Sequence, residues 1–287
     1  MLQWKVGEAT ITSILESQAP TSPRFLFDGL SKQDVLSRAE AAGWLRPHFV
    51  TEDGYLLLRI QCLVVDVGGH RIAVDTCVGN NKPRHSPDWN DLQLPFLEDL
   101  TAAGYPPESI TEVVCTHLHV DHVGWNTRLV DGNWVPTFTN ARYLFARPEF
   151  EHWKSTPDLF GDDVFGDSVA PIHDAGLADL VAVDHRINEN VWFESTPGHT
   201  PGHISLIVES AGQRAVITGD MVHSPMQIAD PELAAVVDTD QTQSRASRRE
   251  AFARWAASGA LVIGTHFPEP TAGRLVNLGD GGFRLDV

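Results

Sequence analysis

The sequence predicts an α/β fold in which two mixed β-sheets pack face to face and helices cover their outer sides. Strand patterns recur in both halves of the chain, and each half also carries helical patterns. In addition, several strands end directly before a histidine or an aspartate. We find no internal repeat, low-complexity tract or linker, so residues 1–287 are expected to form one domain.

The first third of the chain predicts strands and one helix. A helix is expected over residues 31–42, with Ser31 as its N-cap and Gly43 as its end. Gly68-Gly69 separates two apolar runs and indicates a hairpin. The strands expected here cover residues 2–16 as a pair, then 55–67 and 71–76.

The middle of the chain alternates short elements with loops. Residues 77–92 are polar and rich in turn formers, which predicts a loop, and a helix is expected over 93–104 because Gly104 and Pro106 prevent its continuation. Residues 155–176 predict a second long irregular stretch. Strands are expected over 110–116 and 141–146.

The last third predicts a second group of strands, followed by one long helix. That helix is expected over residues 243–258, ending at Gly259, after a long loop at 223–240. The expected strands cover 178–184, 190–195, a hairpin over 204–219, and 261–265 just before His266.

Composition indicates a globular, acidic chain. Apolar residues make up 42% and charged residues 21%, and 38 acidic against 21 basic residues give a net charge of −17. Such a charge disfavours nucleic acid as a partner and is expected to serve solubility. Cys62, Cys77 and Cys115 lie in or beside apolar runs and are interpreted as free thiols. With no secretory signal and no membrane-spanning run in the sequence, a cytoplasmic location without membrane association is expected.

A dense group of potential metal ligands follows the strand expected at 110–116. The segment THLHVDHVG places His117, His119, Asp121 and His122 within six positions. A short loop can turn alternate side chains inward, so His117 and His119 can share one ion while Asp121 and His122 face a neighbouring position. Imidazole and carboxylate suit zinc, and also iron, manganese or cobalt.

Three later segments each place one further potential ligand after a strand. These ligands are His199, Asp220 and His266, and glycines at 198, 219 and 264 let the backbone approach a site closely. Loops at strand ends that converge on one rim are a common way to build a site. Together with the first cluster they are enough for two ions.

This order of ligands resembles the metallo-β-lactamase superfamily, whose fold is an αββα sandwich. The resemblance runs from Asp75 to His266. It implies that His117, His119 and His199 bind the first metal and that Asp121, His122 and His266 bind the second. It also implies that Asp220 bridges both ions and that Asp75 supports the site from behind the ligands.

Other residues near these motifs are weaker candidates. His203 is expected to orient a ligand, and His223, three residues after Asp220, is expected either to touch substrate or to cap a loop. An apolar substrate would need an apolar wall near the metals. Trp125, Phe96 and Met226 are candidates for that wall, although each taken alone is better explained by ordinary core packing.

The ligand set predicts hydrolysis. Two divalent ions, most simply zinc, would lower the pKa of a shared water toward neutrality, and the resulting hydroxide would attack a carbonyl or phosphorus centre. Asp220 would hold both ions, and Asp121 is expected to carry a proton to the leaving alkoxide.

The substrate is predicted from a narrower resemblance. Segments such as DTCVGNNKPR, CTHLHVDHVGWN and GTHFPEPTAGR are similar to the lactonase-like branch of the superfamily, which includes quorum-quenching N-acyl homoserine lactonases. A small lactone or ester is therefore the expected substrate. The strand pair over residues 2–16 and the stretch 155–176 are the candidate surfaces for a homodimer. The alternatives are a phosphotriesterase or arylesterase of the methyl parathion hydrolase type, a metal-binding protein without turnover, and an oxidoreductase that uses one iron.

Overall fold

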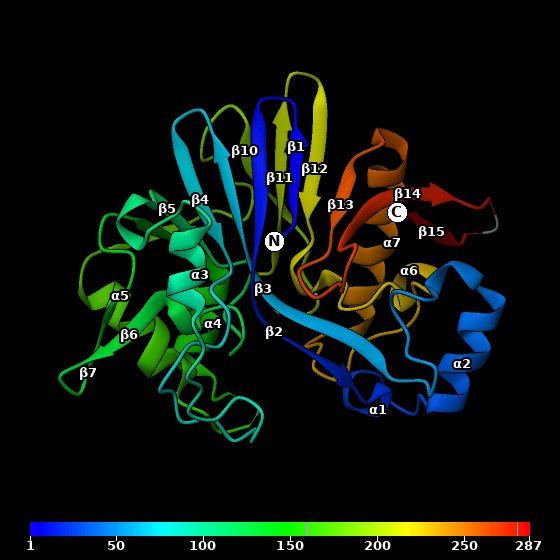
Figure 1. Cartoon of the computed structure of the whole chain (residues 1–287), viewed down its shortest axis with the longest axis horizontal. Coiled ribbons are helices and arrows are strands. Elements are labelled where there is room, and N and C mark those ends of the chain that lie inside the picture. Colours follow the sequence, from blue (N-terminus) through cyan, green and yellow to red (C-terminus); the bar gives the residue numbers. More distant parts are fainter. Residues whose placement is uncertain (159, 280) are drawn as a thin grey trace. The chain divides into compact units, whose positions relative to one another are not determined.

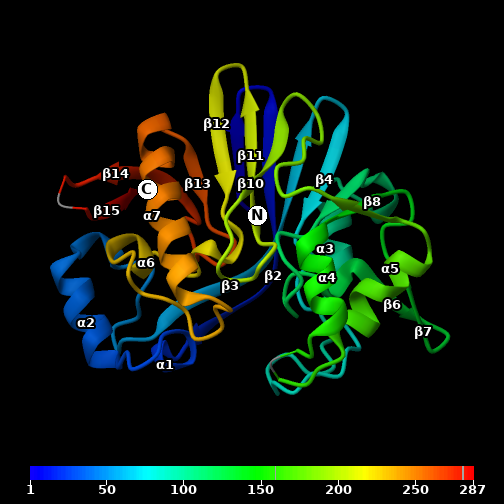
Figure 2. The ribbon, with the colours of Figure 1, turned by 180° about the vertical axis from the view of Figure 1, so that it is seen from behind.

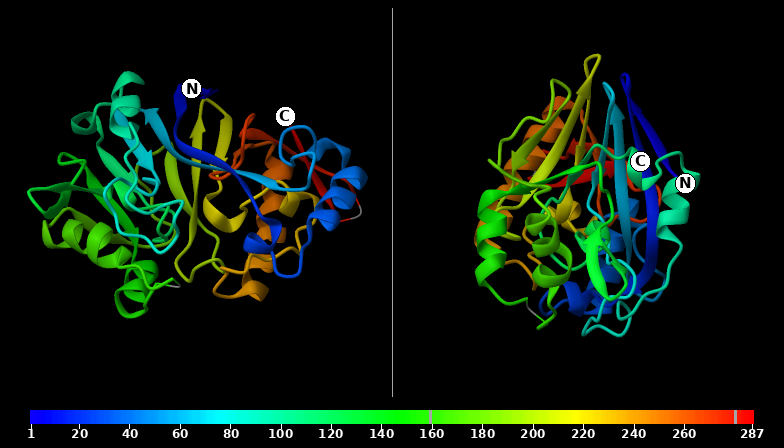
Figure 3. Two further views of the ribbon diagram at one scale, coloured as in Figure 1. Left: turned by 60° about the horizontal axis from the view of Figure 1, so that its bottom comes forward. Right: turned by 90° about the vertical axis from the view of Figure 1, so that its left-hand side faces the viewer.

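The computed structural model describes residues 1–158, 160–279 and 281–287. The chain forms two compact units, one of Met1–Glu16 with Ile60–His185 and one of Ser17–Arg59 with Arg186–Val287. The long strands β2 (Ala9–Thr21) and β3 (Leu56–Val67) contribute residues to both units and are the dark-blue and light-blue ribbons of Figure 3. The prediction of one domain over 1–287 stays a prediction.

The first unit contains most of a seven-stranded mixed sheet in the order β1-β2-β3-β4-β5-β8-β9. β1 pairs antiparallel with β2 and β3 with β4, and β4, β5, β8 and β9 are parallel neighbours. The β3–β4 turn falls at Gly68-Gly69, where both residues have positive φ angles. Besides β2 and β3, the strands are β1 (Gln3–Val6), β4 (His70–Val74), β5 (Glu112–Val114), β8 (Arg142–Ala146), β9 (Ala178–Val181), and a separate hairpin of β6 (Thr127–Val130) and β7 (Asn133–Pro136).

Helices of the first unit cover its sheet, as Figure 1 shows for α3 and α4. Phe96 of α3 and Phe150 of α4 join one apolar core with sheet residues such as Tyr143. Cys62, Cys77 and Cys115 are free thiols buried in the same core, and burial raises the pKa of each thiol. The helical segments are α3 (Phe96–Ala102), η2 (Pro107–Ser109), η3 (Gly124–Asn126), α4 (Arg147–Ser155), the π-helix η4 (Phe165–Val169) and α5 (Ala170–Asp174).

The second unit contains a six-stranded mixed sheet in the order β10-β11-β12-β13-β14-β15. Only the β12–β13 pair is parallel among the described strands of this sheet. The strands are β10 (Val191–Ser195), β11 (Ile204–Ser210), β12 (Gln213–Ile217), β13 (Leu261–Ile263), β14 (Ala272–Asn277) and β15 (Phe283–Asp286).

The longest helix of the second unit, α7 (Gln241–Ser258), packs against β14, as Figure 2 shows. Asp240 caps its first turn, and Gly259 ends it in the left-handed conformation. Helix α2 (Lys32–Ala41) begins with a complete capping box between Ser31 and Asp34. The remaining helical segments are α1 (Pro23–Leu26), η1 (Gly43–Leu45), η5 (Gly219–Met221) and α6 (Met226–Ala229).

Several predicted elements differ from the structure. The helix expected over 93–104 begins only at Phe96, because the Asn80 side chain bonds both the N–H and the C=O of Leu94 and holds that residue in the loop. The stretch 155–176, expected to be irregular, is helical from Phe165 to Asp174, and α6 interrupts the loop expected at 223–240. Helices α1 and α4 and the hairpins β6–β7 and β14–β15 were not predicted.

No helix within the described ranges has the length and apolar character needed to cross a membrane.

Candidate metal centre

The first ligand cluster lies on the loop that follows β5, and Asp75 at the end of β4 fixes its start. The Asp75 carboxylate is buried and accepts hydrogen bonds from the backbone N–H of Thr116, at 2.8 Å, and from the Thr116 hydroxyl. Asp75 adopts a φ of 55°, a left-handed conformation that is uncommon for a residue other than glycine. The strained turn therefore aims a carboxylate at the ligand loop.

Backbone hydrogen bonds fasten this loop to the segment after Asp75. The N–H of Thr76 donates to the C=O of His122 at 2.7 Å, and the N–H of Gly124 donates to the C=O of Cys77 at 2.7 Å. A Cβ atom at Gly124 would lie 1.8 Å from the C=O oxygen of Val78, so only glycine permits this approach. The loop is thus held close to residues 76–78.

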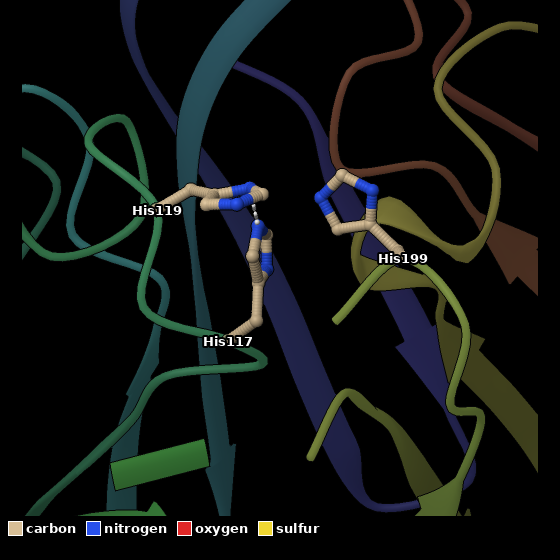
Figure 4. Close-up of side chains that lie close together, drawn as sticks. All are labelled: His117, His119 and His199. Atoms are coloured by element: carbon tan, nitrogen blue, oxygen red, sulfur yellow. Dashed lines mark hydrogen bonds between the residues drawn. The ribbon is translucent and has the colours of Figure 1, made fainter. Parts of the chain in front are cut away.

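His117 and His119 lie side by side in this loop. Nε2 of His117 is 3.0 Å from Nδ1 of His119, which is the contact dashed in Figure 4. The ring of Trp153, from α4, contacts His119 edge to face with centroids 5.0 Å apart. Glu149 of α4 accepts the indole N–H of Trp153 at 2.6 Å and the backbone N–H of Leu118 at 3.1 Å. Glu149 therefore links the backbone of the ligand loop to the Trp153 ring that contacts His119.

His122 lies between two carboxylates. Its Nδ1 is 3.0 Å from Oδ2 of Asp75, and its Nε2 is 3.6 Å from Oδ1 of Asp121. His122 is fully buried, whereas the Asp121 side chain keeps 14% of its surface exposed. Asp75 orients the imidazole from one side, so the other nitrogen faces the same region as Asp121.

The second ligand cluster, in the second unit, is centred on Asp220 in η5 (the His199 ring drawn in Figure 4 belongs to this cluster). Nε2 of His266 lies 3.0 Å from Oδ1 of Asp220. Nε2 of His199 and Nε2 of His223 lie 3.5 Å and 3.2 Å from Oδ2. All four side chains are buried. The cluster thus surrounds one carboxylate with three imidazoles.

Two of these imidazoles are oriented by acceptors on their far side. Nδ1 of His199 is 2.9 Å from Oδ1 of Asp238, and Nδ1 of His266 is 2.6 Å from the C=O oxygen of Arg59. Burial alone would raise the pKa of Asp238, but the contact with His199 holds it at about 2. An acceptor at Nδ1 fixes the tautomer that presents the Nε2 lone pair, as ligand histidines require.

His203 acts on the backbone of Asp220. Its Nε2 accepts the backbone N–H of Asp220 at 2.8 Å, and its Nδ1 contacts the Thr196 hydroxyl at 2.9 Å. Through these two contacts, His203 connects the backbone of Asp220 to the side chain of Thr196.

Close packing explains two of the glycines beside the ligands. Gly198 has a φ of 130°, and a Cβ there would lie 2.2 Å from the backbone nitrogen of Ser244 in α7. A Cβ at Gly264 would lie 2.1 Å from the Phe267 ring. Larger residues would displace the loops that carry His199 and His266.

The apolar candidates lie in the two cores. Trp125 stacks on Phe96 with centroids 5.5 Å apart, and Met226 is fully buried in the core of the second unit. Trp125 also donates its indole N–H to Glu16 at 2.8 Å. Glu16 accepts the backbone N–H groups of Val78 and Gly79 as well, so it fixes the loop after Asp75.

Sequence reasoning missed three buried carboxylates that support the clusters: Glu16, Glu149 and Asp238. Asp238 lies 39 positions after His199 in a region predicted as loop, and no local motif points to it. Glu149 lies in α4, whose start was signalled by Pro148 in the first turn of the helix.

The donor chemistry fits divalent metal ions. The two clusters bring imidazoles and carboxylates together. In addition, His122, His199 and His266 each have a carboxylate or a carbonyl oxygen at Nδ1 that orients the ring. Within the second unit, His199, Asp220 and His223 each offer one donor atom, all within 4.8 Å of one another. Such donor sets suit zinc and its neighbours among the transition metals.

A comparison with protein families identifies the family of the chain. Residues 57–264 match the model of the metallo-beta-lactamase superfamily. The chain therefore belongs to that superfamily, and the α/β fold class predicted from the sequence is confirmed.

Two groups of relatives are similar to the chain. It is 28% identical over 144 residues to the N-acyl homoserine lactonase AiiA of Bacillus thuringiensis subsp. kurstaki, covering 47% of this chain and 51% of that protein. It is 27% identical over 129 residues to the N-acyl homoserine lactonase AttM of Agrobacterium fabrum, covering 42% and 44%. The chain thus spans about half the length of the curated relatives it matches.

Solved structures match over nearly the whole chain. The hydrolase AbOPH of the beta lactamase superfamily aligns with a TM-score of 0.79 at 26% identity, over 99% of this chain and 96% of that chain. AidC, described as a dizinc quorum-quenching lactonase in complex with a product, aligns with a TM-score of 0.79 at 19% identity, again over 99% and 96%. The second likeness concerns the fold alone.

Proposed function

We propose that the two clusters jointly bind two divalent metal ions. His117, His119 and His199 would hold the first ion, Asp121, His122 and His266 the second, and Asp220 would bridge them. Superfamily membership supports this assignment, and so do the buried donors of each unit. Zinc is the ion we expect, with iron, cobalt and manganese as alternatives.

We propose further that the chain is a hydrolase that opens lactone rings, with N-acyl homoserine lactones as the expected substrates. The observation that carries this proposal is the complete histidine and aspartate set in a chain whose curated relatives are named N-acyl homoserine lactonases.

The chain's own residues perform the remaining steps. Bound divalent ions would supply an acidified water and a Lewis acid for the lactone carbonyl. Asp121 is the partly exposed carboxylate of its cluster, so it can take up the proton released when the water attacks and pass it to the departing alkoxide. Asp75, Asp238 and the Arg59 carbonyl hold the imidazoles in place during this transfer.

The Asp121 step is tested with Asp121→Asn. We expect this variant to lose at least about 100-fold in kcat, because an amide cannot carry the proton, while part of its metal content is kept. Metal content and turnover are measured on the same sample. Full metal content with full turnover would refute the proton-transfer role.

The substrate class is tested by assaying metal-free, zinc-loaded and cobalt-loaded protein against lactones, phosphotriesters and aryl esters, with the metal-free sample prepared by dialysis against a chelator. The proposal expects N-acyl homoserine lactones to give the highest kcat/KM, and activity to vanish in the metal-free sample. A preference for phosphotriesters would favour the methyl parathion hydrolase type of activity instead. No turnover on any of the three classes by protein with bound metal would refute the hydrolase proposal.

A further inference from the structure

His223 is an imidazole in the second cluster that the two-metal assignment does not use. It lies three residues after Asp220, beyond the 3-10 helix η5, and only 4% of its surface is exposed. Its ring faces His199, with centroids 4.8 Å apart, and stacks parallel to the ring of His266 at 6.1 Å. A histidine so deeply buried beside three proposed ligands needs a chemical explanation.

The spacing of the donor atoms matches that of ligands around one ion. Nε2 of His223 is 3.2 Å from Oδ2 of Asp220, and Nε2 of His199 is 3.5 Å from the same oxygen. With His223 added to the ligands proposed above, that ion would have five protein donors. Around a five-coordinate zinc ion with bonds of about 2.0–2.1 Å, neighbouring donor atoms lie about 2.9–3.6 Å apart. Both distances fall within that range.

The orientation of the ring also favours a shared ion over a direct hydrogen bond. Among the described residues, neither ring nitrogen of His223 has a partner with hydrogen-bond geometry, although Asp220 lies within reach. Two donor atoms that are close but not aimed at each other can both point at a third position. Leaving both nitrogens of a buried imidazole without partners would be unfavourable, and a metal ion would satisfy one of them.

The position of His223 is fixed from its backbone. Its N–H donates to Oε1 of Gln227 at 2.7 Å, and Gln227 in turn donates to the C=O of Leu233 at 2.9 Å. Gln227 is fully buried. The segment after Asp220 is therefore held so that the His223 side chain stays at the cluster.

We propose that His223 is a metal ligand, so that His199, Asp220 and His223 form a three-donor position within the second unit. This inference rests on the proposed two-metal function and adds an eighth residue to its seven ligands. It makes the second unit able to hold an ion with its own side chains. The binding and release of that ion would then depend on His223, a residue that the family ligand pattern does not contain.

The first test measures metal affinity by competition with a chelator in the full-length protein. We expect His223→Ala to weaken the binding of one ion by more than about 100-fold, beyond the roughly 10- to 100-fold that loss of an outer partner costs. Asp238→Asn supplies that outer-partner comparison, and His173→Ala, at a half-exposed histidine, is the control that should leave affinity unchanged. Wild-type affinity in a folded His223→Ala protein would overturn the proposal.

The second test uses spectroscopy, so it does not depend on activity. The variant His223→Cys is loaded with cobalt, and a thiolate ligand at this position is expected to produce a charge-transfer band in the near ultraviolet that wild-type protein lacks. The three native cysteines are buried in the other unit and serve as the internal control. A folded, cobalt-loaded His223→Cys protein without this band would overturn the assignment.

The two proposals fail separately. Loss of affinity and a thiolate band in a protein that opens no lactone would uphold His223 as a ligand and refute the lactonase activity. A lactonase with two ions whose His223 variants bind metal as the wild type does would uphold the function and refute the ligand.

Discussion

Nδ1 of His199 lies 2.9 Å from Oδ1 of Asp238, and both side chains are fully buried. The second carboxylate oxygen of Asp238 accepts the backbone N–H of Ala235 at 2.9 Å, and the guanidinium of Arg248 lies 3.9 Å away. Asp238 thus orients a proposed ligand while other groups hold Asp238 itself. A pair this constrained should control how tightly the cluster binds metal.

Asp238→Asn is predicted to weaken metal binding by about 10- to 100-fold, because an amide no longer fixes the charge and tautomer at His199. The measurement is a chelator competition on the purified protein. Asp286→Asn, at an exposed aspartate of β15, is the matched control and should bind as the wild type does. Equal affinities for Asp238→Asn and the control would show that Asp238 has only a packing role.

Glu149→Ala is predicted to lower the free energy of unfolding. The variant leaves two buried donors, the Leu118 N–H and the Trp153 indole N–H, without their acceptor, and each such loss costs about 1–3 kcal/mol. Urea denaturation measures the change. Glu151→Ala, exposed on the same helix, should shift the free energy by less than about 0.5 kcal/mol. Similar values for the two variants would refute the proposed support of the ligand loop.

Gly198→Ala is predicted to be more destabilising than Gly212→Ala. Both glycines have positive φ angles, but a Cβ meets the backbone of α7 at residue 198 and open space at residue 212. Backbone strain alone costs about 1–3 kcal/mol. A loss of stability in Gly198→Ala beyond that amount measures the clash with α7. Thermal denaturation of the two variants gives the comparison. Equal losses of stability would mean that the 198 loop can move away from α7 freely.

Lys82 gives a prediction for pH. This lysine is fully buried between Asp167, the Thr127 hydroxyl and the Trp134 ring, and burial lowers its pKa to about 8. Between that value and the ordinary pKa of about 10.4, the unfolded chain binds a proton that the folded chain does not. Protonation therefore favours unfolding as the pH falls through this window, and stability should rise as the pH increases from 8 to 10.4.

The variant Lys82→Met removes this dependence. The free energy of unfolding of the wild type minus that of the variant should increase by at most about 3 kcal/mol between pH 8 and pH 10.4. Equilibrium denaturation at pH 7.5, 9 and 10.5 measures the difference, which cancels the titration of other groups. A difference that is constant with pH would contradict the lowered pKa of Lys82.

Much of the fold was predictable because local signals agreed with the tertiary structure. Ser31 and Asp34 signal the start of α2, and Gly68-Gly69 signal the β3–β4 turn. Helix formation at 165–174 was not predictable, because the burial of Asp167 depends on Lys82 and Arg84 from a loop more than 80 positions earlier. No local pattern reveals such a long-range ion pair.

The candidate site shows the same division. The spacing of His117, His119, Asp121 and His122 is visible in the sequence because one short loop carries all four. The supports are not, since Glu16 reaches the loop after Asp75 from 62 positions away and Asp238 reaches His199 from 39 positions away. Their roles emerge only from the fold.

The central claim, a two-metal lactonase, is tested most directly by titrating metal-free protein with zinc while following the opening of an N-acyl homoserine lactone. The account predicts negligible activity without metal and a rise to a plateau at two equivalents of zinc per chain. Full activity at one equivalent, or no ring opening at two, would contradict it.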